Sequence, residues 1–136
     1  MQNPPPGQTG KSSTGLDENI AALLAYVFGW VSGLVFFLIE KDSKLVRFHA
    51  MQSILFCVVI AVVSIALWVL AVVFVLIASA LPDIMGTLIG LLGSLIWLVY
   101  SVALLIAWIL CLVRAYQGQF FKLPFIGNMA EKIVNK

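Results

Sequence analysis

Few side chains in this sequence could take part in chemistry. His49 is the only histidine, Cys57 and Cys111 are the only cysteines, and no HxxxH, CxxC, GxSxG or Gly-rich phosphate motif occurs. A metal beside His49 would need Glu40, Asp42 or Cys57 as further ligands, without a recognised ligand spacing. Both cysteines fall in apolar segments, where a thiol behaves as a small apolar residue, so free structural thiols are favoured over a redox pair. We expect no metal, no cofactor and no enzyme activity.

The composition indicates that a lipid bilayer surrounds most of the chain. Of 136 residues, 62% are hydrophobic and 10% are charged, whereas soluble domains have about 25% charged residues. A net charge of +2 is too small for a nucleic-acid binder. We therefore expect an integral membrane protein with the lipid bilayer as its main partner, and no nucleic-acid partner.

The positions of the charges predict where the chain crosses the membrane. Residues 1–16 are rich in Pro, Gly, Gln, Ser and Thr and are expected to form a disordered polar head, followed by one helical membrane domain over 17–136. Residues 20–39 form an uncharged run of membrane-spanning length, and the long apolar block after it is broken only at Pro82–Asp83. The prediction is an all-α fold with three transmembrane helices, over 20–39, 54–81 and 85–113. Aromatic residues such as Tyr26 and Trp108 are interpreted as ordinary interfacial side chains.

The basic residues predict an orientation for this three-span arrangement. Seven of them lie in the 40–53 loop or the C-terminal tail, which three spans would place on one side, and Lys11 lies in the head. Because cytoplasmic segments carry an excess of Lys and Arg, the N-terminus is expected outside and the C-terminus in the cytoplasm.

Small residues recur at intervals of four in two of the predicted spans. Membrane helices approach closely at such positions. We therefore predict that the first and third spans pack within one chain, and the alternative is a homo-oligomer through the Gly29/Gly33 face. The helix-packing residues would be Ala21, Ala25, Gly29, Gly33, Gly86 and Gly90.

Two further segments form a predicted cytoplasmic motif. Residues 43–53 run into the second span without a breaker after Ser43, a good N-cap, and should project as an interfacial extension. The tail contains a Pro124 turn and then, over 128–135, the pattern of a short interfacial amphipathic helix capped by Asn128. We expect two extension residues, Arg47 and either His49 or Gln52, to hydrogen-bond the backbone of the tail or the end of the third span. Ordinary snorkelling of the basic side chains is the alternative.

The same segments carry a resemblance to a known family. The runs 18–26 (ENIAALLAY), 44–53 (KLVRFHAMQS) and 122–127 (KLPFIG), with 130–132 (AEK), resemble a family of small prokaryotic multi-pass membrane proteins that includes the magnetosome proteins MamF and MmsF. This family is remotely similar to an inner-envelope component of the chloroplast import machinery. The resemblance covers about residues 17–134 and implies a helical protein of the prokaryotic cytoplasmic (inner) membrane, with no catalytic residues to carry over.

Three classes of function remain open. A membrane scaffold or accessory subunit, acting through helix packing and its cytoplasmic face, is the preferred hypothesis, and it implies a homo-oligomer or a larger membrane complex. A component of a transport or protein-translocation assembly is the main alternative. An enzyme or redox protein is disfavoured, because no acid or base lies within a predicted span.

Overall fold

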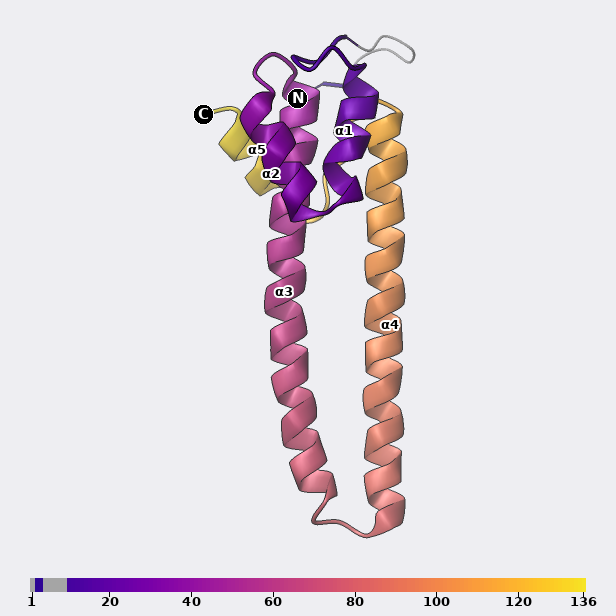
Figure 1. The fold of residues 1–136 in the computed structure, drawn as a ribbon. Coiled ribbons are helices and arrows are strands. Elements are labelled where there is room, and N and C mark those ends of the chain that lie inside the picture. The colour runs from indigo at the N-terminus through magenta and orange to yellow at the C-terminus, as the bar shows by residue number, and fades with distance from the viewer. Residues whose placement is uncertain (1, 4–9) are drawn as a thin grey trace. The chain divides into compact units, whose positions relative to one another are not determined.

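The computed structural model describes residues 2–3 and 10–136, and every regular element in this part of the chain is a helix (Figure 1). The contacts divide the chain into two units. We call Met1–Val58 with Ala107–Lys136 the five-helix unit, and Val59–Ile106 the two-helix unit. The five helices are α1 (Glu18–Val27), α2 (Trp30–Ile39), α3 (Lys44–Ala78), α4 (Asp83–Tyr116) and α5 (Ile126–Val134).

The two-helix unit consists of the later part of α3, the turn after it and the earlier part of α4. Both helices are long and apolar enough to cross a membrane, since each extends about 50 Å against about 30 Å of hydrocarbon. The turn falls at Pro82, next to the only charge of this unit, as the sequence predicts. Large apolar side chains are exposed along both helices of this unit, among them Val62, Ile65, Leu91 and Leu92. Such a surface suits lipid rather than water.

The uncharged run over residues 20–39 is not one helix. It forms α1 and α2, ten residues each, or about 15 Å, which is half the thickness of the hydrocarbon. Between them Gly29 has a φ of 59° and a ψ of −129°, a conformation that glycine adopts easily. The chain reverses there, because Ser13 before α1 hydrogen-bonds Glu40 after α2. The prediction of a transmembrane helix over 20–39 is therefore wrong, and we call this element the α1–α2 hairpin.

Hydrogen bonds explain how the chain can turn inside an apolar segment. A carbonyl left open in hydrocarbon is costly. Ser32 Oγ lies 3.0 Å from the Ala25 carbonyl oxygen and accepts from the Phe28 N–H at 3.1 Å. Two donors come from elsewhere in the chain: Ser53 Oγ reaches Gly29 O at 3.0 Å, and Trp108 Nε1 reaches Tyr26 O at 3.2 Å. The hairpin turn is thus stabilised by α3 and α4, which hydropathy alone does not reveal.

The hairpin also bears on the argument for the predicted orientation. Asn19 at the start of α1 donates to the Tyr116 carbonyl at the end of α4 (3.1 Å), and the Phe120 N–H donates to Asn3 Oδ1 (2.6 Å). Segments near the two ends of the chain therefore meet in the five-helix unit. Among the described residues two helices, α3 and α4, have the length to cross a membrane, so the predicted orientation loses the third span on which it rested.

Part of the predicted polar head is described in the structure. Residues 1 and 4–9 lie outside the described residues. Ser12 N–H donates to Leu16 O at 2.8 Å, Lys11 pairs with Asp17 at 2.6 Å, and the Ser12 side chain is buried. These contacts close residues 10–17 into a turn.

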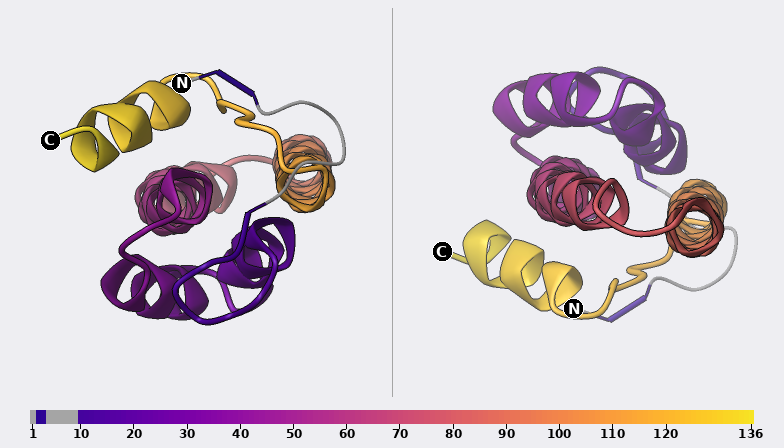
Figure 2. Two further views of the ribbon diagram at one scale, coloured as in Figure 1. Left: turned by 90° about the horizontal axis from the view of Figure 1, so that it is seen from above. Right: turned by 90° about the horizontal axis from the view of Figure 1, so that it is seen from below.

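The first turns of α3 form the centre of the five-helix unit. Figure 2 shows the α1–α2 hairpin on one side of these turns and α5 on the other. Leu45, Val46, Phe48 and Ala50 of α3 are buried, unlike most side chains further along the same helix. The ordered core of the unit therefore surrounds the predicted interfacial extension.

Candidate functional site

Four buried side chains from three helices meet in the five-helix unit. Tyr26 comes from α1, His49 and Gln52 from α3, and Cys111 from α4. Each is at most 1% exposed. His49 and Gln52 are three residues apart, so they lie on the same face of α3. We call these four residues the polar cluster.

The acceptors in the polar cluster determine the direction of its hydrogen bonds. His49 Nε2 lies 2.9 Å from the Gln119 carbonyl oxygen, which can only accept, so this nitrogen carries the proton. In the neutral ring, Nδ1 then accepts from the Tyr26 hydroxyl at 3.1 Å. Gln52 Nε2 donates to Tyr26 Oη at 3.1 Å and to the Phe121 carbonyl at 3.0 Å. Both hydrogens of the Gln52 amide and the Tyr26 proton are therefore used.

The polar cluster fastens the non-helical tail segment, residues 119–123, to α3. The Gln119 and Phe121 carbonyls accept its hydrogen bonds, and the Phe120 ring packs edge-on against Phe48 at 5.5 Å between centroids. Arg114 of α4 adds a bond to the Gln119 side chain at 2.8 Å. The contact expected between the extension and the tail is therefore present, with both His49 and Gln52 as donors.

Arg47 does not take part in this contact, contrary to expectation. It precedes His49 by two residues, which turns its side chain toward a different side of the helix. Its guanidinium lies over the Phe37 ring of α2, 5.2 Å from the centroid. Its Nε is buried without a hydrogen-bond partner in the part of the chain that the structure describes. Arg47 thus contacts the α1–α2 hairpin rather than the tail.

Pro124 lies outside the polar cluster, in the turn before α5. The Ile126 N–H donates to the Pro124 carbonyl at 2.7 Å, and α5 begins at Ile126 rather than at the predicted cap. The residue before α5, Phe125, has a φ of 62° and takes the capping position expected of Asn128. Asn128 is instead an exposed residue inside the helix.

The geometry of the polar cluster suits fixation of the backbone more than catalysis. Its hydrogen-bond donors act on the cluster itself or on backbone carbonyls, and none of its members is exposed. Gln52 Oε1 is buried and has no partner among the described residues, and Cys111 Sγ lies 3.8 Å from Gln52 Nε2. Across residues 2–3 and 10–136, no three His, Cys, Asp or Glu side chains are grouped closely enough to hold a metal ion. The cysteines are free thiols.

A second buried polar contact centres on Glu40, which the sequence offered only as a possible metal ligand beside His49. Its carboxylate accepts from Ser13 Oγ at 2.7 Å, from the Ser43 N–H at 2.9 Å and from the N–H groups of Ser13 and Asp42 at 3.1 Å. Burial by itself raises the pKa of Glu40, but these hydrogen bonds to the charged form outweigh it and hold the pKa below its usual value. Glu40 thereby joins residues 10–17 to the start of α3.

The predicted helix-packing residues do not form a single surface. Ala21 and Ala25 of α1 are fully buried. The same helix contacts the end of α4, because the Asn19 side chain donates to the Tyr116 carbonyl and the Tyr26 carbonyl accepts from Trp108 Nε1. Gly33 of α2 packs against α3 instead, since a Cβ added there would lie 2.9 Å from the Ala50 carbonyl oxygen. Only the α1 part of the predicted contact between the first and third spans is therefore present.

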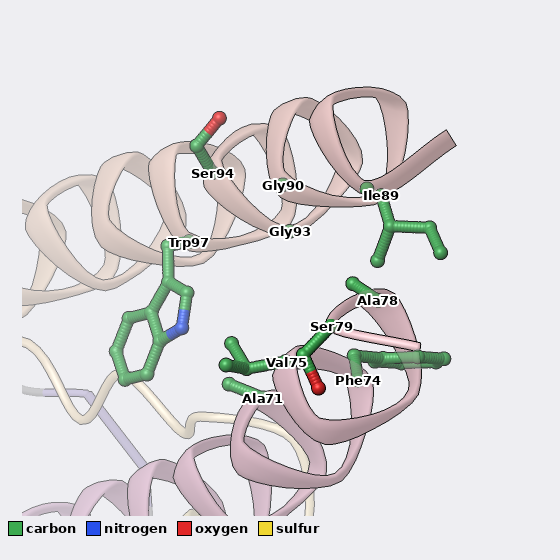
Figure 3. A pocket seen from close by; sticks show the side chains of 11 residues that line it. Ala71, Phe74, Val75, Ala78, Ser79, Ile89, Gly90, Gly93, Ser94 and Trp97 are labelled. Atoms are coloured by element: carbon green, nitrogen blue, oxygen red, sulfur yellow. The ribbon is translucent and has the colours of Figure 1, made fainter. Parts of the chain in front are cut away.

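Gly86 and Gly90 belong to the two-helix unit and line a groove there (Figure 3). The groove has a volume of about 520 Å³ and an apolar lining that includes Phe74, Val75 and Trp97. A Cβ added at Gly90 would meet nothing within 4 Å. Gly90 thus leaves open space in the groove, whereas a Cβ added at Gly86 would lie 3.3 Å from the Ala78 carbonyl oxygen.

Comparison with known proteins shows the family. The model of the "Magnetosome magnetite crystal formation protein family", MamF/MmsF, matches residues 16–130. A UPF0132 membrane protein of Methanocaldococcus jannaschii is 39% identical over 90% of this chain and 94% of its own length. Another, from Archaeoglobus fulgidus, is 33% identical over 86% of this chain and 95% of its own length. No solved structure matches.

The matched segment contains α1 to α4, the polar cluster and the start of α5. The resemblance carried by the segments around Tyr26, Arg47–Gln52 and Pro124 is thereby confirmed. On this evidence the chain belongs to the MamF/MmsF family of small membrane proteins, together with the archaeal UPF0132 membrane proteins.

Proposed function

We propose that this protein is a membrane scaffold or accessory subunit whose five-helix unit contacts another membrane component. The polar cluster is the observation that carries this proposal. Its side chains hydrogen-bond one another and the backbone of the tail, and they thereby hold the α1–α2 hairpin, α3 and the tail together. A buried network whose donors are all engaged within the chain in this way favours one defined structure over turnover of a substrate.

An exposed ridge on α2 is the proposed contact surface. Trp30, Leu34 and Leu38 recur every four residues and are exposed, while Ser32 and Gly33 of the same helix are buried. A contiguous exposed apolar face on a fixed helix is typical of an interaction surface. The contact would leave the two-helix unit free to face lipid.

The charge distribution supports an orientation for this proposal. All eight basic residues belong to the five-helix unit, and the two-helix unit carries Asp83 as its only formal charge. Because Lys and Arg are enriched on the cytoplasmic side, this favours two crossing helices in the prokaryotic cytoplasmic membrane, with both chain ends in the cytoplasm. The α1–α2 hairpin would enter the inner leaflet without crossing it.

Single cysteines test this orientation in a background with Cys57→Ala and Cys111→Ala. Lys11→Cys, Lys132→Cys and Asp83→Cys all replace exposed residues. With an impermeant reagent added to intact cells, we expect labelling at position 83 and none at 11 or 132 until the membrane is opened. Labelling of position 11 but not 132 in intact cells would restore three spans.

Native mass analysis after extraction in mild detergent tests the scaffold. We expect a complex of fixed stoichiometry that Leu38→Ala weakens and that Leu91→Ala, a comparably exposed residue of the two-helix unit, leaves intact. A monomer carrying only lipid would contradict the proposal. Flux of a solute through vesicles containing the purified chain would favour the transport alternative.

A further inference from the structure

The outer face of α5 carries an unusual amount of exposed apolar surface. Phe125, Met129 and Ile133 follow one another at intervals of four, and their side chains are 86%, 54% and 39% exposed. The other side of the helix packs on the five-helix unit through Gly127 and Ala130, which are buried. We call Phe125, Met129 and Ile133 the α5 stripe.

The turn before α5 holds Phe125 in a conformation that costs free energy. Its φ of 62° lies in the left-handed region, where a side chain is strained. The conformation is held from both sides: the Gly127 N–H donates to the Leu123 carbonyl at 2.9 Å, and Lys122 pairs with Glu131 at 2.7 Å. Gly127 lies so close to Lys122 that a Cβ there would be 2.5 Å from the Lys122 Cβ. The backbone is thus fixed around an aromatic side chain that contacts almost nothing in the protein.

The lysines near the α5 stripe indicate that the stripe contacts an anionic lipid surface. Lys132 is exposed and lies three residues after Met129 on α5, and Lys136 is exposed just beyond the end of the helix. An apolar face bordered by lysines is typical of a helix lying at the boundary between headgroups and acyl chains of an anionic leaflet. The α1–α2 hairpin of the same unit has the length to enter one leaflet only.

We propose that the α5 stripe inserts into the anionic leaflet entered by the α1–α2 hairpin, so that the protein concentrates where this leaflet is on the convex side of a curved membrane. The five-helix unit adds the hairpin and α5 to one leaflet, whereas the two-helix unit has only its two crossing helices. Insertion at the headgroup boundary spreads the lipids of one leaflet, and the spreading costs less where that leaflet is already expanded. This proposal uses the membrane placement of the proposed function but needs no protein partner.

The test measures how the purified full-length protein distributes on membranes of different curvature. Giant vesicles of phosphatidylcholine and phosphatidylglycerol receive the protein with Lys11→Cys in the cysteine-free background. An impermeant fluorophore then labels only molecules whose five-helix unit faces outward. In a thin tether pulled from the vesicle, we expect fluorescence per lipid above that of the vesicle body, with a ratio that rises as the tether narrows.

Variants assign the effect to α5. Phe125→Asn with Met129→Gln and Ile133→Gln removes the stripe, and asparagine tolerates the left-handed backbone at position 125. The control, Asn128→Gln with Asn135→Gln, changes exposed polar residues of the same region. We expect the control to concentrate in the tether like the parent protein and the triple variant to do so much less. If amide exchange shows that the triple variant loses α5, Phe125→Asn alone replaces it in the test. We expect this single variant to concentrate in the tether to an intermediate degree.

Two results would overturn the proposal. A ratio of one at every tether radius for the parent protein would exclude a preference for curvature. A stripe variant with folded α5 that concentrates as strongly as the parent would exclude α5 as its cause. Neither result affects the stoichiometric complex expected of a scaffold, so the two proposals can fail independently.

Discussion

The helices α3 and α4 pass through two regions that are stabilised in different ways. In the five-helix unit, α3 buries His49, Gln52 and Ser53, and each makes a hydrogen bond to backbone of another segment. In the two-helix unit the only side-chain bonds described between α3 and α4 involve Tyr100, which lies 2.9 Å from Ser64 Oγ and 3.2 Å from Ile60 O. One helix can therefore combine a specific polar core with a surface that is mostly apolar.

This difference follows from what surrounds each region. Irregular backbone at the hairpin turn and in the tail leaves carbonyls that need donors, and buried polar side chains of α3 and α4 supply them. The two-helix unit is regular helix apart from one turn, so few carbonyls need a donor. Substitutions should consequently have larger effects in the five-helix unit than equivalent substitutions in the two-helix unit.

The largest difference is expected for one substitution made at two glycines. Gly33→Leu would drive a side chain into the Ala50 carbonyl and the Ile54 side chain, so the hairpin would have to leave α3. We expect a loss of about 3 kcal/mol or more of stability, at the upper end for an overpacked site. Gly90→Leu, where nothing lies within 4 Å, should cost far less. Unfolding in mixed micelles measures the stability of both variants. Equal losses of stability would contradict the claim that the two units differ in their tolerance of substitution.

A smaller difference is expected for hydrogen bonds. Gln52→Leu removes two donors and leaves the Phe121 carbonyl without this partner, which should cost about 1–3 kcal/mol. Amide exchange should rise over residues 117–125 while the two-helix unit stays protected. Ser64→Ala removes one bond in the two-helix unit and should cost about 0.6 kcal/mol, the average for such bonds in membranes.

Arg47→Ala should leave amide exchange in the tail unchanged, because Arg47 contacts Phe37 of α2 rather than the tail.

These sites also show what the sequence can reveal. The apolar composition and Pro82–Asp83 predict two long helices and their turn correctly, because length and charge decide where helices cross a bilayer. His49 and Gln52 stand out as polar residues in a helix entering an apolar block. Both observations depend only on neighbours along the chain.

The hairpin turn and the remaining cluster residues could not be predicted in this way. Gly29 lies in an apolar run, and the donors that permit the turn, Ser53 and Trp108, are remote in sequence. Tyr26 looks like an interfacial aromatic residue until the fold brings it beside His49. The local sign of a helix break in this run was Gly29 followed three residues later by Ser32. A count of apolar residues does not detect this pattern.

Acid should loosen the five-helix unit before the two-helix unit. Because hydrogen bonds lower the pKa of Glu40 in the folded protein, its stabilising contribution is complete above the unfolded value, about 4.3. It is lost as the pH falls through the lower folded pKa. Below about pH 4, amide exchange should therefore rise over residues 10–17 and 40–44. Glu40→Gln should show this exchange already at neutral pH and little further change in acid. Equal acid sensitivity of the parent protein and Glu40→Gln would mean that another group controls this segment.

The smallest expected effect is a gain in stability in the two-helix unit. Glycine inside a helix is less favourable than alanine by about 0.5–1 kcal/mol, and Gly90 has room for a methyl group. Gly90→Ala should therefore raise the free energy of unfolding by about that amount. Gly86→Ala is the matched control, since its Cβ would lie 3.3 Å from the Ala78 carbonyl oxygen and should cancel the gain. The same measurement also tests whether a second copy of the chain fills this groove: if one of its helices occupied the groove at Gly90, the added methyl group would weaken the dimer. Gly90→Ala would then lower the apparent stability in a manner that depends on protein concentration, whereas a groove filled by lipid predicts a gain that does not.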